Sequence, residues 1–369
     1  MAEPLLDMRL SAAFSDREQT RLIAACPRTD RVSARLWMLC VVATLSARAA
    51  PPDVGIQKML GAVSSDRIAA TVKTLAGFET RGNYSDPNQK TRGIGAARRW
   101  IFDQFHSYSA RLEVSYDTAK QGSTDVTSVI AVLRGAAEPE KRIVVAAHYD
   151  SINLRVKGAQ AAEAPAPGAD DNASGTAVVL ELARVMSQYR FRKSIVFIAF
   201  AGEEIGMVGS TRYAARARAG KEQIEAVFNN DIVGANVLGV THNIIDGSDD
   251  ATGTPDGETG NRLRVYSPDS PDSASRRLAL AVQEAATRYV PALKIDLIPT
   301  ADRFGRTGDQ APFQSNGFAA IRLTSASEDT ASQHTANDLP EGVSAAFTAG
   351  VARIDGAAIA TLASLLPSR

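Results

Sequence analysis

Cysteine and histidine are scarce in this chain of 369 residues, and their positions limit its metal chemistry. Both cysteines, Cys26 and Cys40, lie within the first forty residues. The rest of the chain therefore has neither a disulfide framework nor a thiolate ligand. Only four histidines are present, so a metal bound by the main body must take imidazole nitrogen and carboxylate oxygen as ligands.

Net charge is also lacking, because 41 Lys and Arg are balanced by 41 Asp and Glu. This balance gives no reason to expect nucleic acid or an anionic membrane as a partner. The composition, with 44% hydrophobic and 22% charged residues, is typical of a globular protein. No low-complexity tract or repeat interrupts the chain after Pro51, so residues 50–369 are predicted to form a single domain.

The N-terminal segment has the layout of a secretory signal. A basic stretch at residues 28–35 precedes an apolar run at 36–45, and Ala47-Arg48-Ala49 resembles a cleavage site. The run is short for a membrane span. We therefore expect residues 1–49 to be a leader and signal peptide, with the true start near Val32, and a secreted or periplasmic mature chain without a stable membrane span. An uncleaved N-terminal anchor is the alternative.

Strands and helices alternate along the main body. Continuous apolar runs at 143–147, 194–200 and 226–228 are typical of strands buried on both faces. Helical spacing follows the first run at 176–186 and the second at 206–216. This order predicts an α/β fold with a mostly parallel twisted central sheet, helices on both faces and mixed edge strands. Further helices are expected at 64–75, 95–105, 276–289 and 344–366, and further strands at 112–116, 128–133 and 319–323.

An acidic pair, Asp170 and Asp171, lies in the small-residue loop 168–175 directly before a predicted helix. Asp is a common helix cap, and the helix dipole favours negative charge at this end. A buried acidic pair, however, also needs a compensating cation. The loop alone leaves both interpretations open.

Other polar residues follow the predicted buried strands in the same way. His148, the pair Glu203 and Glu204, and Asp231 each come directly after one of the three apolar runs. In open α/β sheets the ligand crevice lies outside the carboxyl ends of the strands, so these side chains should meet at one edge. His334 is a further candidate from a C-terminal loop, whereas His106 and His242 are expected to be structural.

The set His148, Asp170, Glu204, Asp231 and His334 has too many ligands for one open tetrahedral centre, and it suits two metal ions that share a carboxylate. Glu203 is left over as a base for a metal-activated water. Asp150 is placed to accept the second N–H of the His148 imidazole and to fix its tautomer.

Five stretches make the sequence resemble the M28 family of zinc exopeptidases, of the secreted aminopeptidase type. They are residues 147–151, 167–175, 200–210, 230–234 and 334–338, and they occur in the family's order. The resemblance implies the zinc-exopeptidase (phosphorylase/hydrolase-like) fold, two Zn²⁺ per chain, and peptide or protein N-termini as substrates.

The resemblance also implies a role for each residue. His148 and Asp231 would bind one metal, Glu204 and His334 the other, with Asp170 as the bridge. Glu203 would be the general base and acid, and a cis peptide would follow the bridge, at Asp170–Asp171. One departure is Gln310 in Gly308-Asp309-Gln310, where family members often carry histidine, so a substrate-facing contact is expected to differ.

Three alternative functions were weighed for the same residues, and the sequence does not separate the second of them from an aminopeptidase. A glutaminyl-cyclase-like acyltransferase would use a single zinc, which leaves His148 and Asp231 without a role. A carboxypeptidase of the same fold differs only in which end of the substrate it binds. A metal-free, non-catalytic homologue would have no need of the intact ligand set.

Overall fold

The computed structural model describes residues 51–234, 261–268, 270, 272–302, 306–326 and 328–367. The predicted leader and signal peptide, with both cysteines, lies outside these residues. So do His242 and nearly all of the acidic loop 246–261. Predictions about these segments therefore stay predictions.

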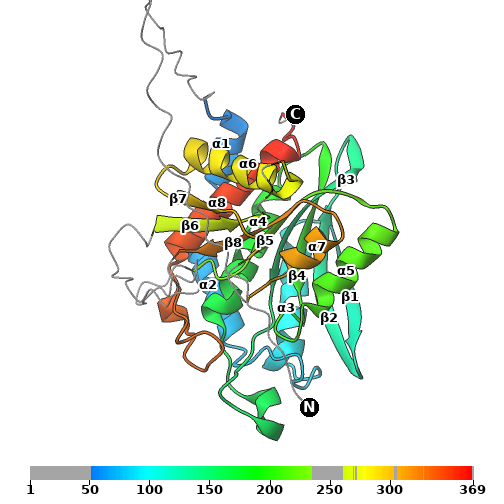
Figure 1. Ribbon diagram of the computed structural model, residues 1–369, viewed down its shortest axis with the longest axis vertical. Helices are drawn as coiled ribbons and strands as arrows, with labels where there is room; N and C mark the ends of the chain where they lie inside the picture. The colour runs from blue at the N-terminus through cyan, green and yellow to red at the C-terminus, as the bar shows by residue number, and fades with distance from the viewer. Residues whose placement is uncertain are drawn as a thin grey trace, which may run out of the picture. The chain divides into compact units, whose positions relative to one another are not determined.

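One mixed sheet forms the centre of the described chain (Figure 1). Its order is β1-β2-β4-β3-β5-β8-β6-β7. The strands are β1 (Leu112–Gln121), β2 (Thr124–Leu133), β3 (Glu138–His148), β4 (Lys193–Phe200), β5 (Gln223–Asn230), β6 (Arg262–Tyr266), β7 (Lys294–Ile298) and β8 (Ala320–Ser325). The central strands β4, β3, β5 and β8 are parallel, whereas β1–β2, β2–β4 and β8–β6 pair antiparallel. The predicted fold class is thus confirmed, mixed edges included.

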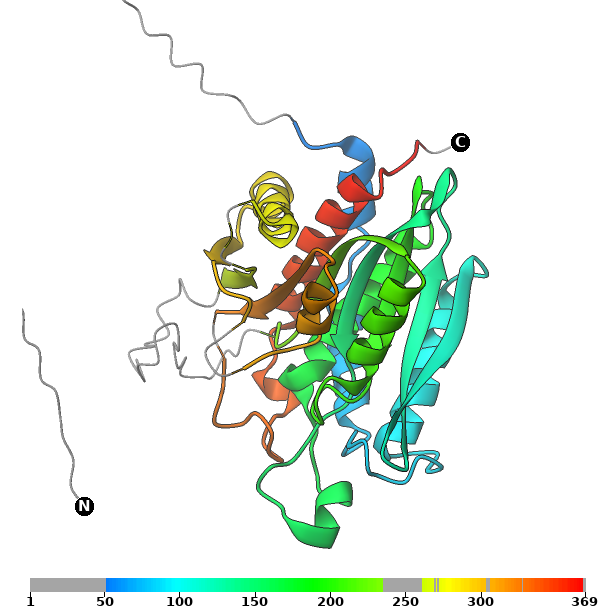
Figure 2. The same ribbon diagram turned by 45° about the vertical axis from the view of Figure 1, so that its right-hand side comes forward.

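Helices cover both faces of this sheet, as the two views of the ribbon show (Figure 2). They are α1 (Val54–Leu60), α2 (Ser65–Ala76), α3 (Gly93–Tyr108), α4 (Gly175–Met186), α5 (Val208–Ala219), α6 (Ala274–Tyr289), α7 (Gln310–Ser315) and α8 (Ala345–Leu362). The Ser64 hydroxyl caps α2 by accepting from the Arg67 N–H, and Ser344 caps α8 in the same way. The last helix ends at Leu362, four residues earlier than its apolar pattern predicted.

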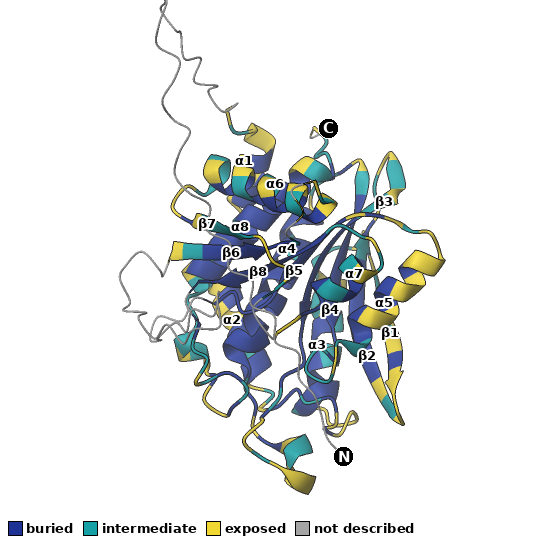
Figure 3. Ribbon diagram, viewed as in Figure 1, coloured by how far each residue is buried: buried dark blue, intermediate teal, exposed yellow. Residues whose placement is uncertain are grey.

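The strands alternate their side chains between two hydrophobic cores. Val145 of β3 points into the larger core, which α4 and α8 cover, whereas Val144 points into a smaller core under α5 and α7. The central strands and α8 are accordingly buried along most of their length (Figure 3). Among the described residues, α8 is the one helix long and apolar enough to cross a membrane, and 72% of it is buried inside the fold.

Two helices and two strands were not predicted from the sequence, namely α1, α7, β6 and β7. In β6 the apolar residues Leu263 and Val265 alternate with arginines, so no continuous apolar run marks the strand.

His106 lies on an exposed part of α3, where its ring stacks on Phe102 at 6.4 Å between centroids. A structural role for His106 is consistent with this contact.

Candidate metal and catalytic site

The carboxyl ends of three parallel strands bring the predicted ligands together. His148 is the last residue of β3, Glu204 follows the end of β4, and Asp231 follows β5 directly. They form two groups of possible metal donors with residues from two loops. The groups are His148, Asp171 and Asp231, and Asp171, Glu204 and His334; the donor atoms within each group lie within 4.8 Å of one another.

Asp171 belongs to both groups, with one carboxylate oxygen in each. Its Oδ1 lies 3.3 Å from His148 Nε2, which is also 3.4 Å from Asp231 Oδ1. Its Oδ2 lies 3.1 Å from His334 Nε2, which is also 3.2 Å from Glu204 Oε2. A carboxylate shared in this way is the geometry that two neighbouring metal ions require.

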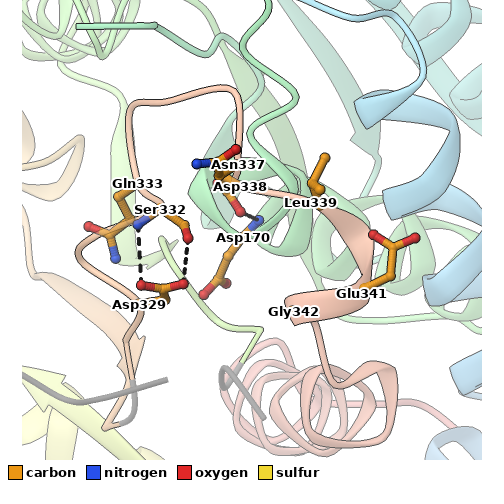
Figure 4. Close-up of a pocket in the computed structure, with 9 residues that line it drawn as sticks. All are labelled: Asp170, Asp329, Ser332, Gln333, Asn337, Asp338, Leu339, Glu341 and Gly342. Atoms are coloured by element: carbon orange, nitrogen blue, oxygen red, sulfur yellow. Dashed lines mark hydrogen bonds between the residues drawn. The ribbon is translucent and has the colours of Figure 1, made fainter. Parts of the chain in front are cut away.

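The prediction that Asp170 is the bridge is therefore corrected to Asp171. Asp170 Oδ1 accepts a hydrogen bond of 2.8 Å from the Gly234 N–H. Its other oxygen is buried and has no hydrogen-bond partner among the described residues. The side chain points into a different pocket, which Asp329 and Asp338 also line (Figure 4). The cis peptide is likewise one residue later than predicted, at Asp171–Asn172.

Hydrogen bonds to the backbone orient the acidic pair. The Asp338 carboxylate accepts from the N–H groups of Asp170 and Asp171, at 2.8 and 2.9 Å. Gly168 begins the turn in the left-handed region, with φ +52°, and a Cβ there would lie 2.5 Å from the Asp171 carbonyl oxygen. Only glycine fits this position without strain. The fully buried guanidinium of Arg81 donates to the Gly168 carbonyl and fixes the loop further.

Asp150 lies where the sequence predicted, beside His148. His148 Nδ1, the ring nitrogen that faces away from the possible metal donors, lies 3.2 Å from the backbone carbonyl oxygen of Asp150 and 3.6 Å from its carboxylate Oδ1. Its carboxylate also accepts from the Asn83 side chain at 2.6 Å and from the Glu204 N–H at 3.2 Å. Asp150 thus connects the first imidazole to the turn that carries Glu203 and Glu204.

Burial and the mutual proximity of the donor groups shift their pKa values. Burial and the nearby Asp171 raise the pKa of Glu204 to about 7. Burial acts to lower the pKa of His334, but hydrogen bonds to Asp171 and Glu204 outweigh it and raise that pKa to about 10. The pKa of His148 is also raised well above its ordinary value, because Asp231 and its other carboxylate neighbours outweigh burial.

These shifts mean that protons offset the carboxylates when no metal is bound. Glu204 Oε1 is buried without a hydrogen-bond partner among the described residues, so the donor set is not satisfied by protein groups alone. Two imidazoles and three carboxylates are good ligands for zinc or a similar divalent ion. The residues present therefore fit a pair of such ions.

Glu203 lies beside the donor groups without belonging to either. Burial raises the pKa of its carboxyl well above the ordinary range, and the charges of Asp231 and Glu204 add to this effect, while His148 opposes it. A carboxylate with a raised pKa is a better proton acceptor, which suits a general base.

Arg322 is a site residue that the sequence analysis missed. This buried side chain of β8 places Nη2 3.0 Å from Asp231 Oδ2 and Nη1 3.1 Å from Asp302 Oδ2. Arg322 therefore forms an ion pair with Asp231 Oδ2, whereas His148 lies near the other oxygen, Oδ1. An arginine inside the apolar run 319–323 was the available signal, since a buried charge requires a partner.

Gln310, where a substrate-facing contact was expected to differ from the family pattern, has its side chain engaged within the protein. The side chain is fully buried; Oε1 accepts from Asn229 at 3.0 Å and Nε2 donates to Asp302 Oδ2 at 2.6 Å. Both ends of the amide are thus hydrogen-bonded within the protein, and Arg322 contacts the same Asp302 oxygen.

Comparison with known proteins agrees with the geometry. Residues 128–358 match Peptidase family M28. A probable zinc metalloprotease of Pyricularia oryzae is 35% identical over 347 residues, which cover 86% of this chain and 68% of that protein.

Similar solved structures include the LapA aminopeptidase of Legionella pneumophila, with a TM-score of 0.66, 20% identity, and coverage of 91% of this chain and 81% of that chain. The glutaminyl cyclase of Porphyromonas gingivalis has a TM-score of 0.60 and 20% identity, and covers 82% of this chain and 99% of its own. At this identity the two structures show a shared fold. The match to the family over residues 128–358, the similarity to the probable zinc metalloprotease and the shared fold together establish that the chain belongs to peptidase family M28.

Proposed function

We propose that this chain is a two-zinc exopeptidase that releases N-terminal residues from peptides, with Glu203 as general base. Membership of the family makes it a metallopeptidase. The single observation that carries the two-metal proposal is Asp171, whose two oxygens belong to separate groups of three donors. Action on N-termini follows the motif resemblance to secreted aminopeptidases, and export follows the signal-like segment at 32–49.

Each residue has a defined task in this proposal. His148 and Asp231 would hold one ion, Glu204 and His334 would hold the other, and Asp171 would offer one carboxylate oxygen to each group. Zinc bound there would polarise the scissile carbonyl and lower the pKa of a bound water. Glu203 accepts the proton of the attacking water and delivers it to the leaving amine. Asp150 keeps the His148 ring in the tautomer that leaves Nε2 free for the metal.

The alternatives make different demands on the same site. A single-zinc cyclase would leave one complete three-donor group without an ion, which argues against it because buried carboxylates need compensation. A carboxypeptidase would bind a free α-carboxylate instead of a free α-amine. A non-catalytic homologue would bind no metal and hydrolyse no peptide.

The Glu203→Gln substitution tests the proposed base. We expect the variant to keep its zinc, because Glu203 belongs to neither donor group, and to lose at least about 100-fold in kcat, because the amide cannot accept the proton. The measurements are zinc per chain by elemental analysis and hydrolysis of peptides with free and with acetylated N-termini.

Glu204→Gln is the matched control, since the same change one residue later should lower the zinc content as well. Near wild-type turnover by Glu203→Gln would disprove the assigned role. Equal cleavage of free and acetylated peptides would disprove N-terminal selection.

A further inference from the structure

The pocket into which Asp170 points has a volume of about 150 Å³. Two loops line it (Figure 4): Asp170 comes from the loop 168–175, and the other lining residues lie between 329 and 342, in the loop that carries His334. None of the five possible zinc donors lines this pocket. The pocket is therefore separate from the zinc site, although the same two loops contribute to both.

The lining of the pocket is acidic and rich in oxygen. Four of the nine described residues that line it carry carboxylates, and none of the nine is a lysine, arginine or histidine. Three more have a hydroxyl or an amide oxygen. The acids are Asp170, Asp329, Asp338 and Glu341, and the other oxygen-bearing side chains are Ser332, Gln333 and Asn337. Negative charge in the lining is thus balanced by no basic side chain among these nine residues.

Asp170 is the member of this group whose bonding is incomplete. The residue is only 6% exposed, and its Oδ1 accepts a hydrogen bond from the Gly234 N–H. Its Oδ2 is buried and has no hydrogen-bond partner among the described residues. A buried carboxylate oxygen without a donor is costly, and in folded proteins a bound ion or an ordered water usually satisfies such an atom.

Hydrogen bonds already orient the two neighbouring carboxylates. Asp338 accepts from the N–H groups of Asp170 and Asp171, so it stays beside the Asp170 backbone. Asp329 accepts from the Ser332 hydroxyl at 2.5 Å, and in the close-up its carboxylate is turned towards the same space as that of Asp170 (Figure 4). Each carboxylate oxygen has two lone pairs, so one hydrogen bond leaves room for a further ligand.

The chemistry of the lining favours Ca²⁺ over other metal ions. Zinc takes nitrogen and sulfur ligands readily, whereas Ca²⁺ takes six to eight oxygen ligands from carboxylates, amides, carbonyls and waters. Mg²⁺ requires a nearly ideal octahedron, which loops with varied side chains do not supply. The volume also suits a partly hydrated ion, because each water takes up about 30 Å³ in the liquid.

We propose that this pocket binds one Ca²⁺ ion, which fastens the loop of Asp171 to the loop of His334. Asp170 directly precedes Asp171, and Asp329 and Asp338 flank His334 in sequence. An ion held between these carboxylates stabilises the relative position of two possible zinc donors without touching either of them. The proposal does not depend on the proposed peptidase activity, since it concerns a second ion outside the zinc site.

Calorimetric titration of the zinc-saturated protein with CaCl₂ is the test. We expect one Ca²⁺ per chain with a Kd of about 0.1 to 1 mM, the range of extracellular calcium modules. Because the ion binds the folded chain, CaCl₂ should also raise Tm. MgCl₂ and NaCl at matched ionic strength are the comparison, and both should bind more weakly and raise Tm less.

Asp170→Asn and Asp329→Asn each remove one carboxylate from the pocket. Each variant should keep the wild-type zinc content, raise the Kd for Ca²⁺ at least about 10-fold and lose most of the Tm increase, because the ion loses a close opposite charge. Asp103→Asn, at an exposed position of α3, is the matched control and should bind Ca²⁺ as the wild type does.

Three results would overturn the proposal. One is a wild type that shows neither binding nor a Tm increase up to about 10 mM CaCl₂, ten times the weakest affinity expected. Another is unchanged Ca²⁺ affinity in both Asp170→Asn and Asp329→Asn, which would place the ion elsewhere. The third is Mg²⁺ binding as tight as Ca²⁺ binding. Binding and Tm are measured without substrate, so these outcomes are independent of whether the chain cleaves peptides.

Discussion

Asp150 shows how one carboxylate can position a whole site without touching the metal. It is fully buried and interacts with His148, Asn83 and the turn at Glu203 and Glu204. Partners of this kind orient a ligand imidazole and raise its basicity.

The Asp150→Asn variant keeps the shape of this group but removes its charge. We expect zinc affinity or kcat/KM to fall about 10- to 100-fold, the usual effect of losing a partner of a ligand histidine. Competition with a chelator measures the affinity directly. Glu113→Gln, at an exposed pair with Arg134, is the control and should change neither value. Wild-type affinity and turnover in Asp150→Asn would contradict the positioning role.

The acidic pair marks the limit of prediction at this scale. The sequence identified the loop and four of the five residues that the structure groups as possible metal donors, because each of them follows a recognisable strand or motif. It could not distinguish Asp170 from Asp171, since the two are identical and adjacent. Their difference arises from backbone direction, which the Asp338 carboxylate fixes from a distant part of the chain.

Among the elements, α8 carries an unusual buried acid. Asp355 is fully buried, and its Oδ2 accepts from the Asn230 side chain at 2.8 Å on β5, while Oδ1 has no hydrogen-bond partner among the described residues. Burial raises the pKa of Asp355 to about 7, although the Asn230 hydrogen bond opposes this.

The raised pKa makes folding stability depend on pH. Between about pH 4 and 7 the folded chain holds a proton on Asp355 that the unfolded chain has lost, so this group's contribution to stability falls as pH rises, by at most about 4 kcal/mol. Asp355→Asn should therefore raise Tm relative to wild type more at pH 8 than at pH 5. Thermal denaturation of zinc-loaded protein at both pH values measures the effect.

Exposed Asp103 of α3 supplies the control, because Asp103→Asn should leave the pH dependence of Tm as in the wild type. If Asp355→Asn and the wild type lose the same Tm between pH 5 and 8, Asp355 is not the group responsible.

Element prediction succeeded where burial on both faces leaves a continuous apolar run. The runs in β3, β4 and β5 were found for this reason. The strands β6 and β7 were missed because charged residues interrupt them, and Arg262 of β6 pairs with Asp296 of β7 across the strands. That pairing is visible only once the two strands are side by side.

At the scale of the whole molecule, the site exists only in the folded chain. Its possible donors come from five segments that the parallel strands and the loop at 328–338 bring together, although Asp171 and His334 are far apart in sequence. Zinc binding is therefore coupled to folding, and the number of ions bound reports on the geometry of the entire sheet edge.

The most direct measurement is the zinc content and thermal stability of the wild type, Asp171→Asn and Asp170→Asn after saturation with zinc and removal of excess. We expect two zinc ions per chain in the wild type and in Asp170→Asn, and at most one in Asp171→Asn, with a lower Tm for the last. Two tightly bound ions in Asp171→Asn together with loss of zinc from Asp170→Asn would contradict the shared role of Asp171.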